Sequence, residues 1–340
     1  MKELKIIFMG TAELSCASLE TLARNKNFQV AAVVTQPDKP KGRDLKPQPS
    51  PVKILAQKLN LLVLQPAHAR DEKFVSELRE LKPDLIVVVA YGQILPPAIL
   101  DLPRFGCLNV HTSLLPKYRG ASPIQSAILN GETETGVTIM KMDVGLDTGE
   151  IISQARTPIL PEDNSQSLHD RLAQLGAELL AQTIPDFAAG KIQPQPQSPE
   201  GASYAAKIKK EHGKIDWNEP AEKILNRLRA FMPWPGAFTF FGGETEPQII
   251  RATTNPKKSL PIIIPPRPPQ LLKIWKAEIV ARPGMAGEIL SADKNGIVVA
   301  CGKNALRILE LQRESGRRMS AAEFLAGNSL KAGEKFDQPG

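Results

Sequence analysis

The chain has 340 residues, of which 42% are hydrophobic, 23% charged and 5% aromatic. This length predicts two domains with the composition of an ordinary globular protein, and the scarcity of aromatics argues against a base-stacking surface for single-stranded nucleic acid. The three cysteines are far apart and form no CxxC pair, and the apolar run near the N-terminus is short. These features argue against a disulfide framework, a zinc site, a signal peptide and a membrane span, so we expect a cytoplasmic protein with no metal and no membrane contact.

The positive charge is concentrated near the C-terminus. The net charge is +7, yet residues 1–200 hold 21 basic against 22 acidic side chains, and residues 201–340 hold 22 against 14. A basic domain joined to a neutral one suits a polyanionic partner such as RNA or DNA. A basic soluble domain without such a partner would have the same charge.

Strand-like and helix-like segments alternate through the first half of the chain. The strand-like runs are almost continuously apolar, as expected for parallel strands buried on both faces. The expected strands are residues 5–9, 30–35, 61–64, 84–90, 108–111, 136–143 and 149–159, and the expected helices are 13–24, 52–59, 71–81 and 167–184. This alternation predicts a doubly wound, mostly parallel α/β sheet of the Rossmann-like type.

A second domain is expected after a break in composition. Residues 190–206 are rich in Pro, Gln and Ser, which is typical of a linker, so we place the α/β domain at 1–189 and the second domain at 207–340. A helix over 220–231 precedes several short strands with glycine-containing turns. These strands are expected at residues 237–241, 248–253, 271–280, 287–292, 296–302 and 305–312. The pattern predicts a small antiparallel, OB-like β-barrel.

A proline-rich stretch interrupts this second domain. Residues 255–270 contain six prolines in sixteen positions. Because proline cannot donate a hydrogen bond to a neighbouring strand, we expect an extended loop inserted between two strands, not a central strand. A proline-rich ligand for another protein is the alternative interpretation.

Candidate catalytic residues follow one of the predicted strands. Asn109 and His111 are two residues apart, so their side chains share one face near the carboxyl end of the strand, where doubly wound sheets bind ligands. Asp147 lies in a glycine-rich loop between two later strands. The chain has neither GxGxxG nor a P-loop, which argues against NAD and ATP. Singly, each of the three residues is also compatible with a purely structural role.

Together, the three side chains fit the transfer of an acyl group to an amine. Asn109 could donate a hydrogen bond to a developing oxyanion, His111 could stabilise that charge or carry a proton, and Asp147 could orient the imidazole. No Ser or Cys nucleophile is paired with the histidine in a recognisable motif. Direct transfer is therefore favoured over a covalent intermediate.

The runs LNVHTSLLPKYRGASP, residues 108–123, and TGVTIMKMDVGLDTGEII, residues 135–152, resemble the folate-dependent formyltransferase family. The resemblance implies 10-formyltetrahydrofolate as the co-substrate. It also implies that Asn109, His111 and Asp147 are the catalytic residues. The family's folate contact after the histidine falls on Ser113, Leu114, Leu115 and Pro116.

Three further features resemble the members of this family that act on tRNA. They are the basic loop of residues 35–53, the basic C-terminal domain, and the pair of segments 203–217 and 228–238. The resemblance implies formylation of the α-amine of methionine on initiator tRNA. No extended amphipathic surface or heptad pattern suggests a protein partner, so we expect a monomer. In these members the inserted loop reaches the acceptor end of the tRNA, and the corresponding residues here are Lys41, Arg43 and Lys46. The proline-rich stretch departs from the family pattern and leaves the tRNA surface near it undefined.

Other functions remain open on sequence grounds. A formyltransferase acting on a nucleotide-linked amino sugar would share the catalytic residues, but it would not need the basic loop or the basic second domain. A shorter relative that formylates a purine precursor would not need residues 201–340. A formyl-folate hydrolase would need no RNA surface. A non-catalytic RNA-binding protein would not need the intact set of Asn109, His111 and Asp147.

Overall fold

The computed structural model describes residues 3–41, 46–242, 248–250, 262–264 and 268–336. The chain divides into two compact units. The first comprises residues 1–127 and 132–207, and the second comprises 128–131 and 208–340. Each unit is considered separately below.

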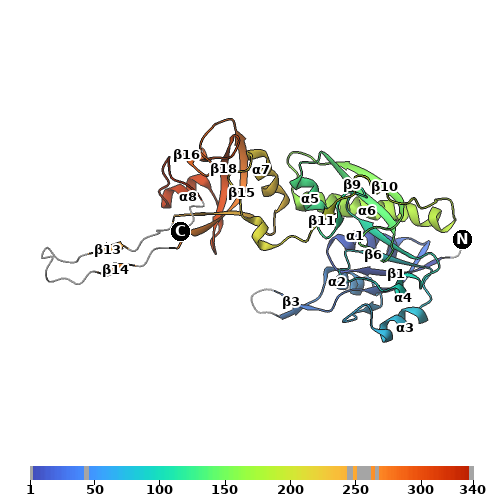
Figure 1. The fold of residues 1–340 in the computed structure, drawn as a ribbon. Helices are drawn as coiled ribbons and strands as arrows, with labels where there is room; N and C mark the ends of the chain where they lie inside the picture. The colour runs from blue at the N-terminus through green and yellow to red at the C-terminus, as the bar shows by residue number, and fades with distance from the viewer. Residues whose placement is uncertain (1–2, 42–45, 243–247, 251–261, 265–267, 337–340) are drawn as a thin grey trace. The chain divides into compact units, whose positions relative to one another are not determined.

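The first unit is built on a seven-stranded sheet in the order β10-β9-β7-β6-β1-β2-β5 (Figure 1). The five strands from β7 to β5 are parallel, whereas β9 runs antiparallel to both β7 and β10. The strands are β1 (Leu4–Gly10), β2 (Phe28–Val34), β5 (Val63–Leu64), β6 (Leu85–Val89), β7 (Cys107–His111), β9 (Glu134–Lys141) and β10 (Ile151–Pro158). The prediction of a mostly parallel α/β sheet is confirmed.

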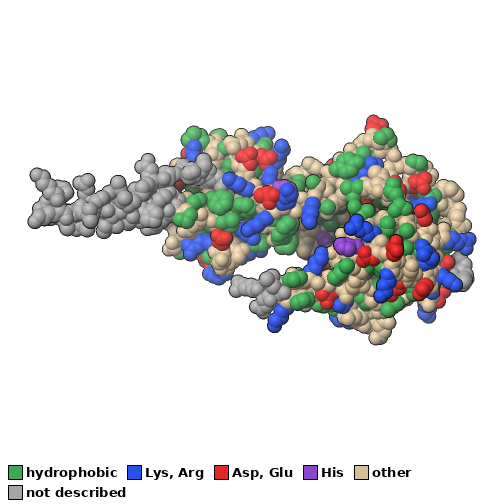
Figure 2. All heavy atoms as spheres, turned by 60° about the horizontal axis from the view of Figure 1, so that its bottom comes forward, with side chains coloured by type: hydrophobic (Ala, Val, Ile, Leu, Met, Phe, Trp, Pro, Cys, Tyr) green, Lys and Arg blue, Asp and Glu red, His purple; other side chains and the backbone are tan. Residues whose placement is uncertain are grey.

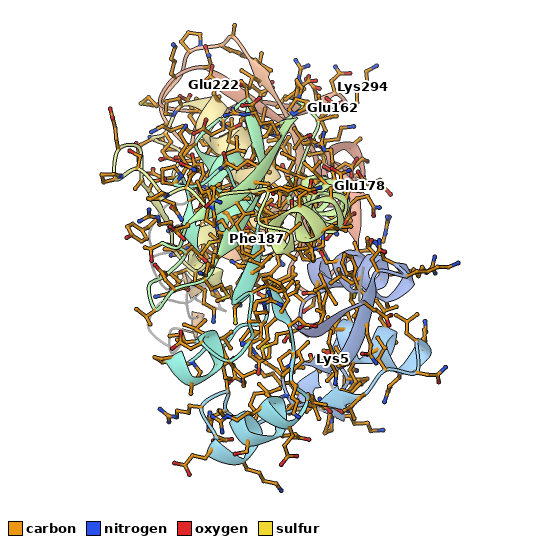
Figure 3. All side chains as sticks on the ribbon, turned by 90° about the vertical axis from the view of Figure 1, so that its right-hand side faces the viewer. Lys5, Glu162, Glu178, Phe187, Glu222 and Lys294 are labelled. Atoms are coloured by element: carbon orange, nitrogen blue, oxygen red, sulfur yellow. The ribbon has the colours of Figure 1, made fainter. Side chains whose placement is uncertain are left out.

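Helices cover both faces of this sheet (Figures 1 and 3). On one face, Phe74 of α3 and Ile99 of α4 share a buried cluster with Ile7 and Ile86 of the strands. On the other face, Gly176 of α6 lies against Val110 of β7, since a Cβ at Gly176 would be 2.9 Å from that side chain. The helices are α1 (Leu14–Arg24), α2 (Pro51–Lys58), α3 (Glu72–Glu80), α4 (Pro97–Leu100), α5 (Pro123–Leu129) and α6 (Ser165–Ala188).

Local sequence explains where these elements begin. The side chain of Asn164 accepts hydrogen bonds from the first turn of α6, and Ser167 closes the reciprocal capping contact. Ser50 caps α2 in the same way, with Pro51 at the first helical position. The strand β6 has five buried apolar residues in a row, as expected for the middle of a sheet covered on both sides.

The second unit contains an antiparallel sheet in the order β12-β15-β18-β17-β16, with β19 paired to β18. Trp217, Ile224 of α7 and Phe324 of α8 pack into its buried core. The elements are α7 (Ala221–Ala230), β12 (Ala237–Phe241), β15 (Gln270–Val280), β16 (Ile289–Asp293), β17 (Gly296–Ala300), β18 (Ala305–Arg313), β19 (Arg318–Ser320) and α8 (Ala321–Gly327), preceded by a short 3₁₀ turn at Lys210–Gly213. The antiparallel prediction is confirmed. Closure into a barrel is not, because no pairing among the described residues joins β12 to β16.

Two short strands flank the proline-rich stretch. Among the described residues, β13 (Gln248–Ile250) pairs with β14 (Ile262–Ile264) and with no strand of the main sheet, and the rest of the strand expected at residues 248–253 lies outside the described residues. Most of the stretch 255–270 lies outside the described residues. Strand β14 consists of three consecutive isoleucines that stand between prolines in the sequence. Isoleucine, unlike proline, has a backbone N–H that can donate to a neighbouring strand.

The segment expected to be a linker, residues 190–206, is hydrogen bonded to the first unit. Gln195 pairs with Ile151 in both directions, and β11 (Tyr204–Ala205) pairs with β8 (Arg119–Gly120). C-terminal to α6, the two units divide between residues 207 and 208. None of the helices in the described ranges is long and apolar enough to cross a membrane.

Candidate active site

Asn109 and His111 lie at the carboxyl end of β7, and Asp147 lies in the loop between β9 and β10. The structure brings these three side chains together. Asn109 Nδ2 donates to Asp147 Oδ1 at 3.3 Å, and His111 Nδ1 lies 3.7 Å from Asp147 Oδ2. The backbone N–H of Gly120 donates to the same Oδ2 at 2.8 Å. Two side chains of β7 and the backbone N–H of Gly120 in β8 thus converge on one carboxylate.

The orientation of His111 is set mainly by a main-chain carbonyl. The imidazole is 6% exposed, and its Nε2 lies 2.9 Å from the carbonyl oxygen of Tyr118. Because a carbonyl can only accept, Nε2 carries a proton. In the neutral imidazole, Nδ1 therefore has a free lone pair and faces Asp147. The prediction that Asp147 orients the ring is thus incomplete, because the shorter contact is the one to Tyr118.

The loop that carries Asp147 has a constrained backbone. Asp147 has a φ of 53°, in the left-handed region that residues other than glycine rarely adopt. Two residues later, a Cβ on Gly149 would lie 1.8 Å from the carbonyl oxygen of Lys141. Glycine at this position therefore lets the loop pack directly on β9 and places the carboxylate beneath Asn109.

The four predicted folate contacts form the turn that follows β7. Ser113 is buried and its hydroxyl donates to the carbonyl of Lys117 at 2.6 Å. The N–H of Leu115 donates to Thr138 Oγ1 at 3.1 Å, and its carbonyl accepts from Gln154 Nε2 at 2.9 Å. Leu114 and Pro116 are partly exposed. The turn is therefore held from β9 and β10 and presents an apolar surface next to His111.

The basic loop after β2 contains a short hairpin, in which β3 (Lys39–Lys41) pairs with β4 (Lys46–Gln48). Lys46 is exposed, whereas Arg43 lies outside the described residues. At the base of the hairpin, Asp38 accepts two hydrogen bonds from Lys53 and one from Gln65. The hydrogen bond from Lys53 is the main cause that lowers the pKa of the Asp38 carboxyl, and the hydrogen bond from Gln65 lowers this pKa further. The hairpin is thus anchored at its stem.

Sequence reasoning missed the groups that hold the three candidate side chains in place. Tyr118 acts through its carbonyl, and Gly120 acts through its N–H, so neither carries a side-chain signal. Gln197 donates to the carbonyls of Asp147 and Gly149, but it stands in a Pro-Gln repeat that looked like linker. Of these three residues, only Gly120 has a sequence signal, since glycine allows another backbone to approach closely. In the described part of the chain, His, Cys, Asp and Glu form no group of three that could hold a metal ion.

Comparison with known proteins gives a consistent assignment. The family model described as formyl transferase matches residues 4–184, and the one described as formyl transferase, C-terminal domain, matches residues 207–329. The methionyl-tRNA formyltransferase of Citrifermentans bemidjiense is 46% identical over 333 residues, covering 98% of this chain and 96% of the relative. That of Geobacter sulfurreducens is 45% identical over 340 residues, covering 100% and 99%.

A solved structure shares the fold. The N-formyltransferase from Helicobacter canadensis, in complex with folinic acid and dTDP-3-aminofucose, has a TM-score of 0.60 at 22% identity, covering 91% of this chain and 99% of that one. This likeness concerns the fold alone. The two family models match in sequence order, and together they span both units described above. The chain therefore belongs to the formyl transferase family.

Proposed function

We propose that this enzyme transfers the formyl group of 10-formyltetrahydrofolate to the α-amine of methionine on initiator tRNA. The observation that carries the proposal is the convergence of Asn109, His111 and Gly120 on the Asp147 carboxylate at the end of β7. The full-length similarity to methionyl-tRNA formyltransferases supports the choice of acceptor.

The donor set suits acyl transfer without a covalent enzyme intermediate. An amide nitrogen has two N–H groups, so Asn109 can hold Asp147 with one and donate the other to the formyl oxygen as negative charge develops there. The free lone pair of His111 Nδ1 can accept a proton from the attacking amine. The imidazolium formed is stabilised by Asp147 at 3.7 Å.

Protons and bonds balance around His111. A bond forms between the methionine nitrogen and the formyl carbon, and the bond from that carbon to the folate nitrogen breaks. The proton taken up by Nδ1 then passes to the departing folate nitrogen, which returns the imidazole to its neutral state. In this scheme Tyr118 keeps Nε2 protonated throughout, so only one ring nitrogen exchanges protons.

The residues present also fit the folate partner. Formyl-folate brings ring systems and a neutral formyl group, and the turn at 113–116 offers two leucine side chains and a proline. Leu115 is buried and Leu114 partly exposed, so the turn has both a fixed base and an accessible apolar surface.

The choice of a tRNA as the formyl acceptor rests on the positive charge of residues 201–340. Residues 201–340 hold 22 basic against 14 acidic side chains. Figure 2 shows Lys and Arg side chains spread over the visible face of the second unit, with a few acidic side chains among them. Such a surface attracts phosphates without reading sequence. Lys41, Arg43 and Lys46 are proposed to contact the acceptor end of the tRNA.

Replacement of Asn109 by alanine is the direct test of the transfer site. We expect kcat to fall about 10²- to 10³-fold, because one oxyanion donor is lost. The measurement is the rate of formylation of methionyl-tRNA, with a nucleotide-linked amino sugar as the competing acceptor. Asn27→Ala, at an exposed position, is the control. A folded Asn109→Ala enzyme with wild-type turnover would refute the role of Asn109 as an oxyanion donor. A wild-type enzyme that formylates the amino sugar but not methionyl-tRNA would refute the proposed acceptor.

Replacement of Lys46 by alanine tests the basic loop. Each phosphate contact releases counterions, so we expect the slope of log affinity for initiator tRNA against log salt to become shallower by about one. We also expect KM for the tRNA to rise while kcat stays close to wild type. Lys73→Ala, an equally exposed position on α3, makes the same charge change away from the loop. Identical salt slopes for the two variants would exclude Lys46 as a phosphate contact.

A further inference from the structure

The segment of residues 195–205 contacts both loops of the active site. It follows α6 and precedes residues 208–340, the larger part of the second unit. At one end Gln197 bonds to the loop of Asp147, and at the other Ser203 and β11 bond to the loop of Tyr118. We call this segment the strap.

Gln197 is placed at the junction of three chain segments. Its Nε2 donates to the carbonyl of Asp147 at 2.9 Å and to the carbonyl of Gly149 at 2.7 Å. Its Oε1 accepts from the guanidinium of Arg119, from Nε at 3.0 Å and from Nη2 at 2.7 Å. Arg119 is 9% exposed, so this pair lies in partly desolvated surroundings where such bonds are strong.

The orientation of the amide follows from these partners. A guanidinium only donates, and a carbonyl only accepts. Oε1 must therefore face Arg119, and Nε2 must face the two carbonyls. Both hydrogens of the amide nitrogen are directed at backbone carbonyls of the same loop, that of Asp147 itself and that of Gly149 two residues later.

The remainder of the strap holds the loop that orients His111. The hydroxyl of Ser203 accepts from the N–H of Tyr118 at 2.9 Å, and the carbonyl of Ser203 accepts from the N–H of Arg119 at 2.8 Å. A Cβ on Gly120 would lie 2.8 Å from the carbonyl of Ala205, so the two backbones are in close contact. Tyr118 supplies the carbonyl for His111, and Gly120 supplies an N–H for Asp147.

We propose that Gln197 is a positioning residue for formyl transfer, which fixes the left-handed backbone of Asp147 and so aligns its carboxylate with His111 and Asn109. The inference rests on the proposed function and adds to it a residue that touches no reacting atom. Asp147 adopts φ of 53° and needs external contacts to keep it there, and the Gln197 amide supplies one directly at its carbonyl. The Arg119 side chain fixes which way that amide points.

The sharpest variant is Gln197→Glu. It keeps the size of the side chain and the acceptor for Arg119, but it turns an oxygen toward two carbonyl oxygens. Misplacement of a catalytic group by about 1 Å costs about 10²-fold, so we expect kcat to fall about 10- to 100-fold with KM for both substrates changed less than twofold. Gln197→Ala should lower kcat over the same range. Gln195→Ala, at an exposed side chain two residues earlier in the strap, should leave both constants unchanged.

A double-mutant cycle separates positioning from loss of packing. If Gln197 acts through Asp147, then adding Gln197→Glu to Asp147→Ala should lower kcat less than twofold further. An equal fold-loss in both backgrounds would overturn the proposal. So would a wild-type kcat in Gln197→Glu, or a change confined to KM.

A second readout needs no substrate and so does not depend on the proposed reaction. The chain has four histidines, so the ring signals of His111 can be assigned by NMR. We expect them to shift in Gln197→Glu and in Gln197→Ala but not in Gln195→Ala. Unshifted His111 signals in both Gln197 variants would overturn the positioning role. Shifted signals in a chain that never formylates methionyl-tRNA would refute the proposed function and leave the positioning role standing.

Discussion

Asp147→Asn is expected to lower kcat about 10²- to 10⁴-fold while the protein stays folded. The carboxylate accepts from Asn109 and from the N–H of Gly120, and it faces His111, which donates to it once protonated. An amide has one oxygen, so its NH₂ must face at least one of these donors. It also carries no charge to stabilise the imidazolium. The measurement is single-turnover formylation of methionyl-tRNA.

The matched control for this variant is Asp101→Asn, which removes the same charge at an exposed position. Thermal unfolding of both variants shows whether the loop remains packed. Because the Gln197 amide and Gly149 hold the loop through main-chain atoms, we expect Asp147→Asn to keep its melting temperature close to wild type. A turnover within threefold of wild type would show that Asp147 does not act in the reaction.

His111→Ala is expected to lower kcat by a similar factor, about 10²- to 10⁴-fold, because it removes the group proposed to carry the proton. KM for either substrate should change less, since the imidazole acts after both have bound. His68→Ala, at an exposed position, is the control.

Exogenous imidazole sharpens the His111 experiment. The substitution leaves a buried space next to the carbonyl of Tyr118, which can hydrogen bond to an added imidazole in place of the Nε2–H. We expect partial recovery of turnover with imidazole in His111→Ala and no recovery in Asp147→Asn. Equal responses of the two variants would contradict the proton-carrying role.

The three proposed catalytic residues were candidates from the sequence alone. Asn109 and His111 alternate with apolar residues on a strand that ends in a turn, and this pattern places both side chains on one face at the carboxyl end. Asp147 stands between Gly145 and Gly149, and glycine-flanked loops at that edge are where ligands bind. The structure adds the distances that join them.

The second domain was only partly predictable. Alternation and turns indicated antiparallel strands, and β15 and β18 follow the expected ranges closely. Closure of a barrel depends on pairing between strands far apart in sequence, and β12 and β16 are not paired in the described structure. The run at 248–250 has strand-forming residues, yet it pairs with β14 outside the main sheet, because its partner is determined by tertiary contacts.

The sequence by itself determined the α/β architecture and pointed to the three proposed catalytic side chains, because strand burial and side-chain chemistry are properties of short stretches of chain. Tertiary structure alone decided how those side chains are held. The Tyr118 carbonyl and the Gly120 N–H are backbone groups of a kind that nearly every residue has, so the sequence does not mark them. Gln197 stands in a polar segment among other glutamines, so its amide is not marked either. Their roles arise only when residues 195–205 fold back against the loops of β7 and β9, and that contact joins positions up to 85 residues apart.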